Sequence, residues 1–296
     1  MNVESLDKVV KDNMNGARVR RGFVDLDHGQ IHFRAIDGAS AIPLVLIHPS
    51  PGSSKQLEPL MRALAAGGRS VWAPDTAGNG DSDPLAMAQP EIPDLARAAL
   101  AAVTARIEGP FHLYGSHTGA SIAMEIALAQ PDRVASLTIE GMGLYDAGLQ
   151  TDVLERYARE IHPDHEATHL MKVWHFCRDQ YVFWPYYKRS AAGRLPNGLP
   201  EADELHDFVV EVLKAMRTYH LSYRAAFRHP KRSRLPGLSV PVHSICSPSD
   251  MLFEYAREVA ALAPGARMTE LPTWSDPQFH TRTAGVIEPF IREFDR

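Results

Sequence analysis

The feature that most constrains this chain is a short turn between a strand-like run and a helical one. Residues 111–114 favour a β-strand, and the sequence Gly-Ser-His-Thr-Gly of residues 115–119 follows directly. Residues 120–128 then have the composition of a helix. The turn residue adopts strained backbone angles, and close packing of helix on strand leaves no room for a Cβ atom on either side. The two glycines therefore predict a sharp strand–turn–helix unit with His117 at its apex.

Strand-like and helix-like stretches alternate on both sides of this unit. We expect a hairpin at 22–26 and 30–35, further strands at 43–48, 70–74, 239–246 and 267–271, and helices at 56–65, 93–107 and 254–262, with a last helix after the loop 272–280. The run 43–48 is almost continuously apolar, which is typical of strands covered on both faces. This alternation predicts an α/β fold with a parallel, doubly wound sheet. Residues 1–19 are expected to form a loose arm with a short helix over 6–13.

Composition excludes several classes of function. The chain has 296 residues, of which 45% are hydrophobic, so it can bury one core and carry an inserted subdomain. Its net charge of -5 and pI near 6.3 offer no basic surface, and we expect no nucleic-acid partner.

The sequence also bears on location. The first twenty residues are polar and charged, which argues against a signal peptide or anchor, and no apolar run approaches the ~20 residues of a membrane span. Cys177 and Cys246 lie far apart, as expected for reduced, buried thiols in the cytoplasm.

The strand–turn–helix unit resembles the nucleophile elbow of the α/β-hydrolase superfamily, whose apex is normally Ser, Cys or Asp. Three further stretches are similar to that superfamily. Residues 46–54 resemble its His-Gly oxyanion loop with Pro49 in place of the usual glycine, 73–83 the turn after its fourth strand, and 130–140 the exit of the elbow helix. The resemblance covers residues 20–144 and 233–296. It implies a mostly parallel doubly wound sheet with an inserted helical cap.

The resemblance also predicts the domain organisation. Residues 1–144 would form the first part of the core, with 1–19 as the loose arm. Residues 145–232 break the alternation, are helical in pattern and would form the cap. Residues 233–296 would complete the core. The stretch 173–187 is dense in aromatic rings, and some of these should line a pocket beneath the cap.

In the superfamily the catalytic residues occur in the order nucleophile, acid, histidine. By position these are His117, Asp250 after the seventh strand and His280 after the eighth, although a strict count puts Asp276 nearer the usual histidine site. A fold that brings three strand ends to one crevice would join His117, Asp250 and His280. The oxyanion donors would be the amides of Thr118 and Ser50, because Ser50 keeps the N–H that Pro49 lacks.

A histidine at the elbow leaves the chemistry open. Neutral imidazole is a base and a nucleophile near neutral pH, so His117 could attack an acyl group or remove a proton from water or substrate. Ser50 and Ser116 remain weaker candidates as nucleophiles.

Substrate contacts are expected from His48, Arg178 and Trp184. The alternative for Arg178 is an ion pair with Asp179 or another acid of the cap. Residues 165–169 match the zinc motif H-E-x-x-H, but we interpret them as a helix start and a solvated face. We expect neither a metal nor a cofactor.

Three hypotheses follow. The leading one is hydrolysis of an ester, lactone or C–C bond in a small, partly aromatic carbonyl compound. The second is a lyase or cofactor-free oxygenase that uses His117 as a base, and the third is a non-enzymatic ligand receptor. The expected partner is a small-molecule substrate, and a homodimer stays open.

Overall fold

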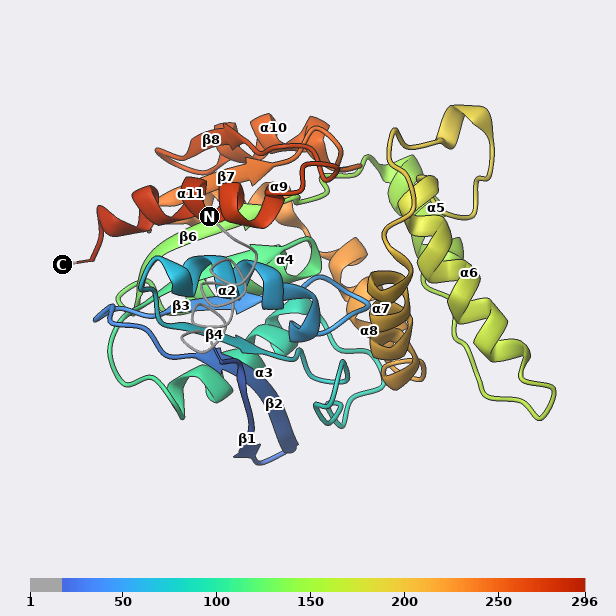
Figure 1. Ribbon diagram of the computed structural model, residues 1–296, viewed down its shortest axis with the longest axis horizontal. Coiled ribbons are helices and arrows are strands. Elements are labelled where there is room, and N and C mark those ends of the chain that lie inside the picture. Colours follow the sequence, from blue (N-terminus) through green and yellow to red (C-terminus); the bar gives the residue numbers. More distant parts are fainter. Residues whose placement is uncertain (1–17, 296) are drawn as a thin grey trace, which may run out of the picture.

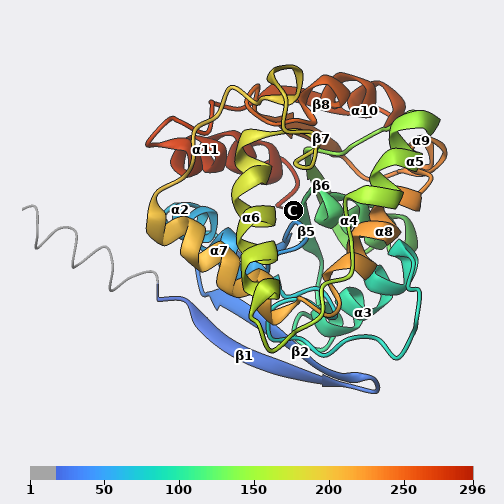
Figure 2. The same cartoon turned by 90° about the vertical axis from the view of Figure 1, so that its right-hand side faces the viewer.

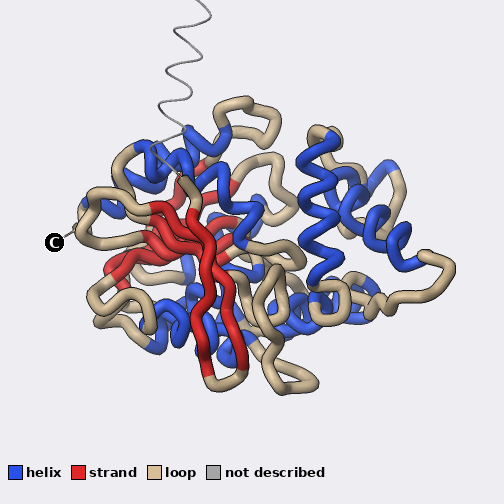
Figure 3. Tube along the Cα trace, turned by 60° about the horizontal axis from the view of Figure 1, so that its bottom comes forward, coloured by secondary structure: helices blue, strands red, loops and turns tan. Residues whose placement is uncertain are grey.

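The computed structural model describes residues 18–295, and the helix expected at 6–13 lies outside them. The protein has one eight-stranded sheet in the order β1-β2-β4-β3-β5-β6-β7-β8. The strands are β1 (Arg20–Leu26), β2 (Gly29–Ile36), β3 (Leu44–Ile47), β4 (Val71–Pro74), β5 (Phe111–Ser116), β6 (Val134–Glu140), β7 (Val242–Cys246) and β8 (Arg267–Glu270). β2 is the one strand that runs opposite to the others, so its pairings with β1 and β4 are antiparallel. The β1–β2 hairpin projects beyond the rest of the sheet (Figures 1 and 3).

Helices cover both faces of the sheet. They are α2 (Glu58–Ala66), α3 (Ile92–Thr104), α4 (Thr118–Ala129), α9 (Lys231–Arg234), α10 (Ala256–Leu262) and α11 (Phe279–Arg292), with 3₁₀ turns at Ser54–Leu57, Ala191–Gly193, Leu235–Gly237 and Phe253–Tyr255. Alternate residues of β3 enter different cores. Leu44 and Leu46 pack in the cluster of α2 and α11, whereas Val45 and Ile47 pack in the cluster of α3 and α4. The predicted doubly wound α/β sheet is confirmed.

The order of the strands places a crevice at the centre of the sheet. The chain adds β4 on one side of β3 and then returns to add β5 on the other side. Loops leave the carboxyl ends of two neighbouring parallel strands in opposite directions at such a point, and ligands bind there in open α/β sheets. The loop after β3 and the turn after β5 therefore flank the same opening.

Before α9, the chain between β6 and β7 forms four longer helices, which we call the helical insertion: α5 (Ala147–Arg156), α6 (Thr168–Val182), α7 (Ala202–Lys214) and α8 (Tyr219–Arg228). They lie beyond one end of the sheet (Figure 1), and α6 and α7 lie in front of the central strands when the molecule is viewed from that side (Figure 2). Most of their buried apolar side chains form a separate cluster drawn from residues 145–227. The insertion thus has a core of its own over the crevice.

The observed elements depart from the expected ones mainly at their ends. The strand expected from 239 begins at Val242, and the helix expected to reach 107 ends at Thr104. Cys177 and Cys246 are both buried, as predicted. No helix within residues 18–295 is long and apolar enough to cross a membrane.

Candidate active site

The turn between β5 and α4 holds His117 in an unusual backbone conformation. His117 has φ 52° and ψ −109°, and its N–H donates to the carbonyl of Glu140 at 2.9 Å. A Cβ atom at Gly115 would lie 2.3 Å from the carbonyl oxygen of Gly119, and one at Gly119 would lie 2.2 Å from that of Ile47. Both glycines are therefore required by close backbone approach, as the sequence predicts. The strain is concentrated at the residue that the turn presents to the crevice.

His117 binds Asp250 directly. Its Nε2 lies 2.7 Å from Oδ2 of Asp250, whose side chain is 1% exposed, while Oδ1 of Asp250 accepts the N–H of Leu252 at 2.8 Å. A carboxylate accepts hydrogen bonds, so the proton of neutral His117 sits on Nε2. Nδ1 has no hydrogen-bond partner within residues 18–295, and the side chain is 27% exposed. The pair thus leaves Nδ1 with a free lone pair at the crevice.

Gly141 makes room for this pair. It follows β6 with φ 60°, and a Cβ atom there would lie 2.9 Å from Nε2 of His117 and 3.1 Å from Oδ2 of Asp250. Both distances are shorter than any ordinary carbon contact. A glycine at this position therefore allows the imidazole and the carboxylate to meet.

The charges around His117 favour its protonated form. Burial alone lowers the pKa of His117, but the charge of Asp250, the hydrogen bond to it and the charge of Glu140 outweigh burial and raise that pKa above its ordinary value. His117 is consequently a stronger base than a histidine in water.

Glu140 is a second titratable group at the site, and sequence reasoning missed it as such. Its Oε2 accepts the hydroxyl of Tyr114 at 2.5 Å. Burial and the charge of Asp250 raise the pKa of Glu140 to about 7, against the opposing effects of Tyr114 and His117. The available signal was an acidic residue at the carboxyl end of the apolar strand 134–140.

Two backbone N–H groups at the cavity lack a hydrogen-bond acceptor in the described chain. Thr118 is the first residue of α4, where an N–H has no partner inside the helix. The N–H groups of Thr118 and Ser50 have no hydrogen-bond acceptor in the described chain, and both residues line the same cavity as His117. The hydroxyl of Ser50 is 2.9 Å from that of Ser222 on α8. Ser50 is therefore better suited to donate its N–H than to act as a nucleophile.

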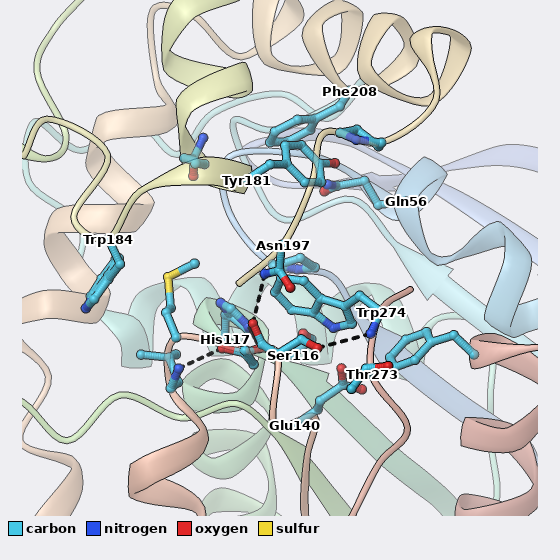
Figure 4. Close-up of a pocket in the computed structure, with 18 of the residues that line it drawn as sticks. Gln56, Ser116, His117, Glu140, Tyr181, Trp184, Asn197, Phe208, Thr273 and Trp274 are labelled. Atoms are coloured by element: carbon cyan, nitrogen blue, oxygen red, sulfur yellow. Dashed lines mark hydrogen bonds and ion pairs between the residues drawn. The ribbon is translucent and has the colours of Figure 1, made fainter. Parts of the chain in front are cut away.

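The cavity has a volume of about 870 Å³ and lies between the sheet and the helical insertion. Figure 4 shows the rings of Tyr181, Phe208 and Trp184 from the insertion on one side and Ser116, His117 and Glu140 from the strand ends on the other. Trp184 lines the cavity, where the sequence analysis expects it. The size suits a small organic molecule.

His280 does not join the arrangement that the superfamily order implies. It lines the same cavity at the start of α11, but no hydrogen bond connects it to His117 or Asp250 among the described residues. Oδ2 of Asp250 is already bound to His117. Asp276 lines the cavity too, yet it accepts the N–H of Gln278 at 2.8 Å and pairs with Arg282 at 3.1 Å. The structure therefore contains a histidine–aspartate dyad where a three-residue arrangement was expected.

Two of the residues expected to contact the substrate, His48 and Arg178, do not line this cavity. His48 is buried away from the cavity, where Nε2 accepts the N–H of Thr76 at 2.8 Å and Nδ1 donates to the carbonyl of Pro49 at 2.9 Å. It tethers the oxyanion loop to the neighbouring turn. Arg178 does not line the cavity either, because its Nε and Nη2 bind Oδ1 of Asp179 at 2.9 and 2.7 Å. The ion-pair alternative for Arg178 is the one observed.

The H-E-x-x-H motif spans the turn before α6 and the first residues of that helix. His165 lies in the turn before α6, and Nδ1 of His169 on α6 accepts the N–H of Asp164 at 3.1 Å. One group in the described chain, His32 with Asp75 and Asp81, has the spacing of metal ligands. There Oδ1 of Asp75 accepts a hydrogen bond from the N–H of Ser54. Its Oδ2 is hydrogen-bonded to Nδ1 of His32 and accepts the N–H of Asp81. Internal hydrogen bonds thus satisfy this carboxylate.

Solved structures share this architecture. The enol-lactonase from Burkholderia xenovorans LB400 superposes with a TM-score of 0.70 at 16% identity, covering 92% of this chain and 100% of that one. Epoxide hydrolase A from Mycobacterium thermoresistibile does so with a TM-score of 0.70 at 19% identity, covering 93% and 98%. At such identities the similarity shows the fold.

Sequence comparison adds a relative and a family. A Pseudomonas putida protein named 2-hydroxy-6-oxononadienedioate/2-hydroxy-6-oxononatrienedioate hydrolase 2 is 36% identical over 135 residues. The match spans 43% of this chain and 44% of that protein, less than half the length of either. A family model described as alpha/beta hydrolase fold matches residues 42–210, which is more than half of the chain. The chain therefore belongs to the alpha/beta hydrolase fold family.

Proposed function

We propose that this protein is a hydrolase of small carbonyl compounds in which His117, held by Asp250, is a general base that activates water. One observation carries the proposal. Nε2 of His117 is hydrogen-bonded to a buried carboxylate at 2.7 Å, which leaves the unpartnered Nδ1 basic at the cavity. A base oriented by a carboxylate in this way is the arrangement that general-base catalysis requires.

The reaction follows from the placement of the groups. Nδ1 of His117 takes a proton from a water molecule as the water oxygen forms a bond to the substrate carbonyl carbon. The carbonyl π electrons move to oxygen, and the N–H groups of Ser50 and Thr118 would stabilise the resulting oxyanion. The carbonyl then reforms, the bond to the leaving group breaks, and the imidazolium returns the proton to the leaving oxygen or carbon.

The proposed substrates are esters, lactones or compounds with a C–C bond beside a carbonyl. The aromatic rings of the insertion favour a partly aromatic or unsaturated molecule. The Pseudomonas putida relative, which matches less than half of the chain, supports an oxo acid as the substrate. Its name describes a hydrolase of an oxo-dicarboxylate.

The same dyad admits two other mechanisms. His117 could attack the carbonyl itself to give an acyl-imidazole, or it could remove a proton from the substrate without water, as a lyase or oxygenase would. The free Nδ1 serves all three, and experiment distinguishes them.

The test is a screen of esters, lactones and diketones in water enriched in ¹⁸O. We expect one solvent oxygen in the acid product, no labelling by a fluorophosphonate and no trapping of an acyl-enzyme by hydroxylamine. Products without solvent oxygen would indicate a lyase. Stoichiometric fluorophosphonate labelling of Ser50 or Ser116 would exclude the histidine-centred mechanism.

His117→Ala should lower kcat by roughly 10²- to 10⁴-fold, the usual contribution of a general base. His280→Ala is the matched control, since it removes a histidine from the same cavity that is not bonded to Asp250. We expect His280→Ala to lower kcat by less than about tenfold. Full activity in His117→Ala, or an equal loss in His280→Ala, would contradict the proposal.

A further inference from the structure

The cavity contains a buried lysine that the proposed chemistry does not use. Lys231, at the start of α9, is 7% exposed and lines the cavity. Its Nζ donates to the carbonyl of Ala226 and lies 5.9 Å from the ring centroid of Tyr145. No carboxylate within residues 18–295 pairs with it. An ammonium group has three N–H donors, so the two that remain need acceptors.

Lys231 differs in this respect from the other buried cations. Arg34 pairs with Glu58 at 3.0 Å, and Arg69 pairs with Glu288 and Asp295 at 2.8 and 2.7 Å. Burying an ammonium without a counter-ion is costly, and charged groups in protein interiors are normally paired. Burial and the nearby charge of Arg232 lower the pKa of Lys231 to about 8, so it is still largely protonated at pH 7. Arg232 itself is bound to Glu258 at 2.6 Å.

One short loop contacts both the dyad and Lys231. The loop that follows β6 places Gly141 against His117 and Asp250, and four residues later it places Tyr145 beneath Lys231. The hydroxyl of Tyr145 has no hydrogen-bond partner in the described structure, and burial raises its pKa, so it remains a donor. Tyr145 packs against Phe227 and Trp184 with centroids 5.9 and 6.1 Å apart, and all three rings line the cavity.

We propose that Lys231, assisted by the hydroxyl of Tyr145, binds a carboxylate of the substrate. The inference rests on the proposed function and narrows its substrate class to carbonyl compounds that carry a carboxylate apart from the reacting carbonyl. A single cation in an aromatic wall compensates one negative charge, which suits a carboxylate better than a phosphate dianion. The substrate would then supply the counter-ion that the protein lacks.

The experiment measures binding rather than turnover. The probes are 4-phenylbutyrate and its neutral isostere 4-phenylbutyramide, titrated calorimetrically into the full chain. We expect the carboxylate to bind at least tenfold more tightly than the amide. Lys231→Met should weaken binding of the carboxylate probe by about tenfold to a hundredfold, the usual range for a charge-assisted hydrogen bond. The affinity for the amide probe should change by less than about twofold.

Lys172→Met is the matched control, since Lys172 is an exposed lysine of α6 that does not line the cavity. Binding of both probes should be unchanged in it. If Lys231→Met fails to fold by circular dichroism, Lys231→Gln replaces it, because its amide can keep the bond to Ala226. Equal affinity for the two probes, no binding of either at millimolar concentration, or retained carboxylate affinity in the Lys231 variant would overturn the proposal.

The inactive His117→Ala protein separates this inference from the proposed function. It should still discriminate between the two probes, because Lys231 and Tyr145 are unchanged. If His117→Ala kept its activity while Lys231→Met lost the discrimination, the dyad mechanism would fail and the carboxylate site would stand.

Discussion

The two walls of the cavity are built from different kinds of structure. On the sheet side, Glu140 ends β6, His117 directly follows β5, and Asp250 lies four residues after the end of β7. Their positions are set by backbone hydrogen bonds and by close approach at Gly141. On the insertion side, the wall includes aromatic rings from α6, α7, α8 and the loops beside them. The sheet wall carries the proposed base and the carboxylate that orients it, and the insertion wall carries most of the aromatic surface.

The polar atoms of the insertion wall are largely bonded to one another. Gln180 accepts the hydroxyls of Tyr223 and Tyr157 at 3.0 and 3.3 Å, and its amide donates to the carbonyl of Phe176 at 3.3 Å. Groups satisfied in this way offer little to a ligand. Lys231, at the junction between the insertion and the core, and the hydroxyl of Tyr145 are exceptions. This contrast predicts that changes to the sheet wall alter the rate, whereas changes to the insertion alter affinity or nothing.

Among substitutions of residues that surround the dyad, the largest effect is expected from Gly141→Ala. The new Cβ would lie 2.9 Å from the ring of His117, at a residue whose φ of 60° is unfavourable for alanine. The imidazole must shift away from Asp250, and we expect kcat to fall by about tenfold to a hundredfold because small misplacements of catalytic groups cost that much. Steady-state kinetics with a substrate found in the screen measures it.

Gly285→Ala provides the control for this substitution. Gly285 lies within α11, and a Cβ there meets nothing within 4 Å. Alanine should raise stability by up to about 1 kcal/mol with no effect on kcat. If Gly141→Ala were as active as Gly285→Ala, the close pairing of His117 with Asp250 would not matter for catalysis.

A smaller effect is expected from Glu140→Gln, and it concerns pH. The charge of Glu140 raises the pKa of His117, so its removal should lower that pKa. Only neutral imidazole acts as a base, and activity therefore rises as pH increases through the pKa of His117. The rising limb of kcat/KM should move to lower pH in the variant, by about one unit or less.

The pH dependence of stability gives an independent test of the protonation of Glu140. The pKa of Glu140 in the folded protein is about 7, above its ordinary value of 4.5. Its contribution to stability is fully present below pH 4.5 and is lost as pH rises through 7. Between pH 5 and 8 the melting temperature of the wild type should fall further than that of Glu140→Gln. Glu108→Gln removes one exposed acid and should leave both profiles unchanged. A Glu140→Gln protein with wild-type profiles would show that Glu140 does not titrate in this range.

The smallest effect is expected from Arg178→Ala in the insertion. Asp179 would keep its second partner, Arg189, whose Nη2 lies 2.7 Å from Oδ2. Arg178 is 35% exposed, so solvent screens the pair, and its loss should cost under about 1 kcal/mol. KM should change by less than about twofold. A tenfold rise in KM with an unchanged melting temperature would mean that Arg178 binds substrate and that the two walls are less distinct than described here.

Local patterns in the sequence determine much of this protein. The alternation of strands and helices predicts the doubly wound sheet, and the spacing of Gly115 and Gly119 predicts the sharp turn with His117 at its apex. The resemblance to the superfamily also implies that Asp250 and Ser50 lie at the crevice. Backbone periodicity and steric limits at a turn are properties of neighbouring residues, so one sequence reveals them.

The choice of partners for each side chain is decided only in the tertiary structure. Superfamily order predicts that His280 bridges the elbow residue and Asp250, but the imidazole of His117 is long enough to reach Asp250 itself. The same pattern could not reveal that His48 turns inward to Thr76, that Glu140 lies beside the dyad, or that Lys231 is buried without a counter-ion. Hydrogen bonds, desolvation and charge depend on distances between atoms far apart in the chain, and these distances exist only once the chain has folded.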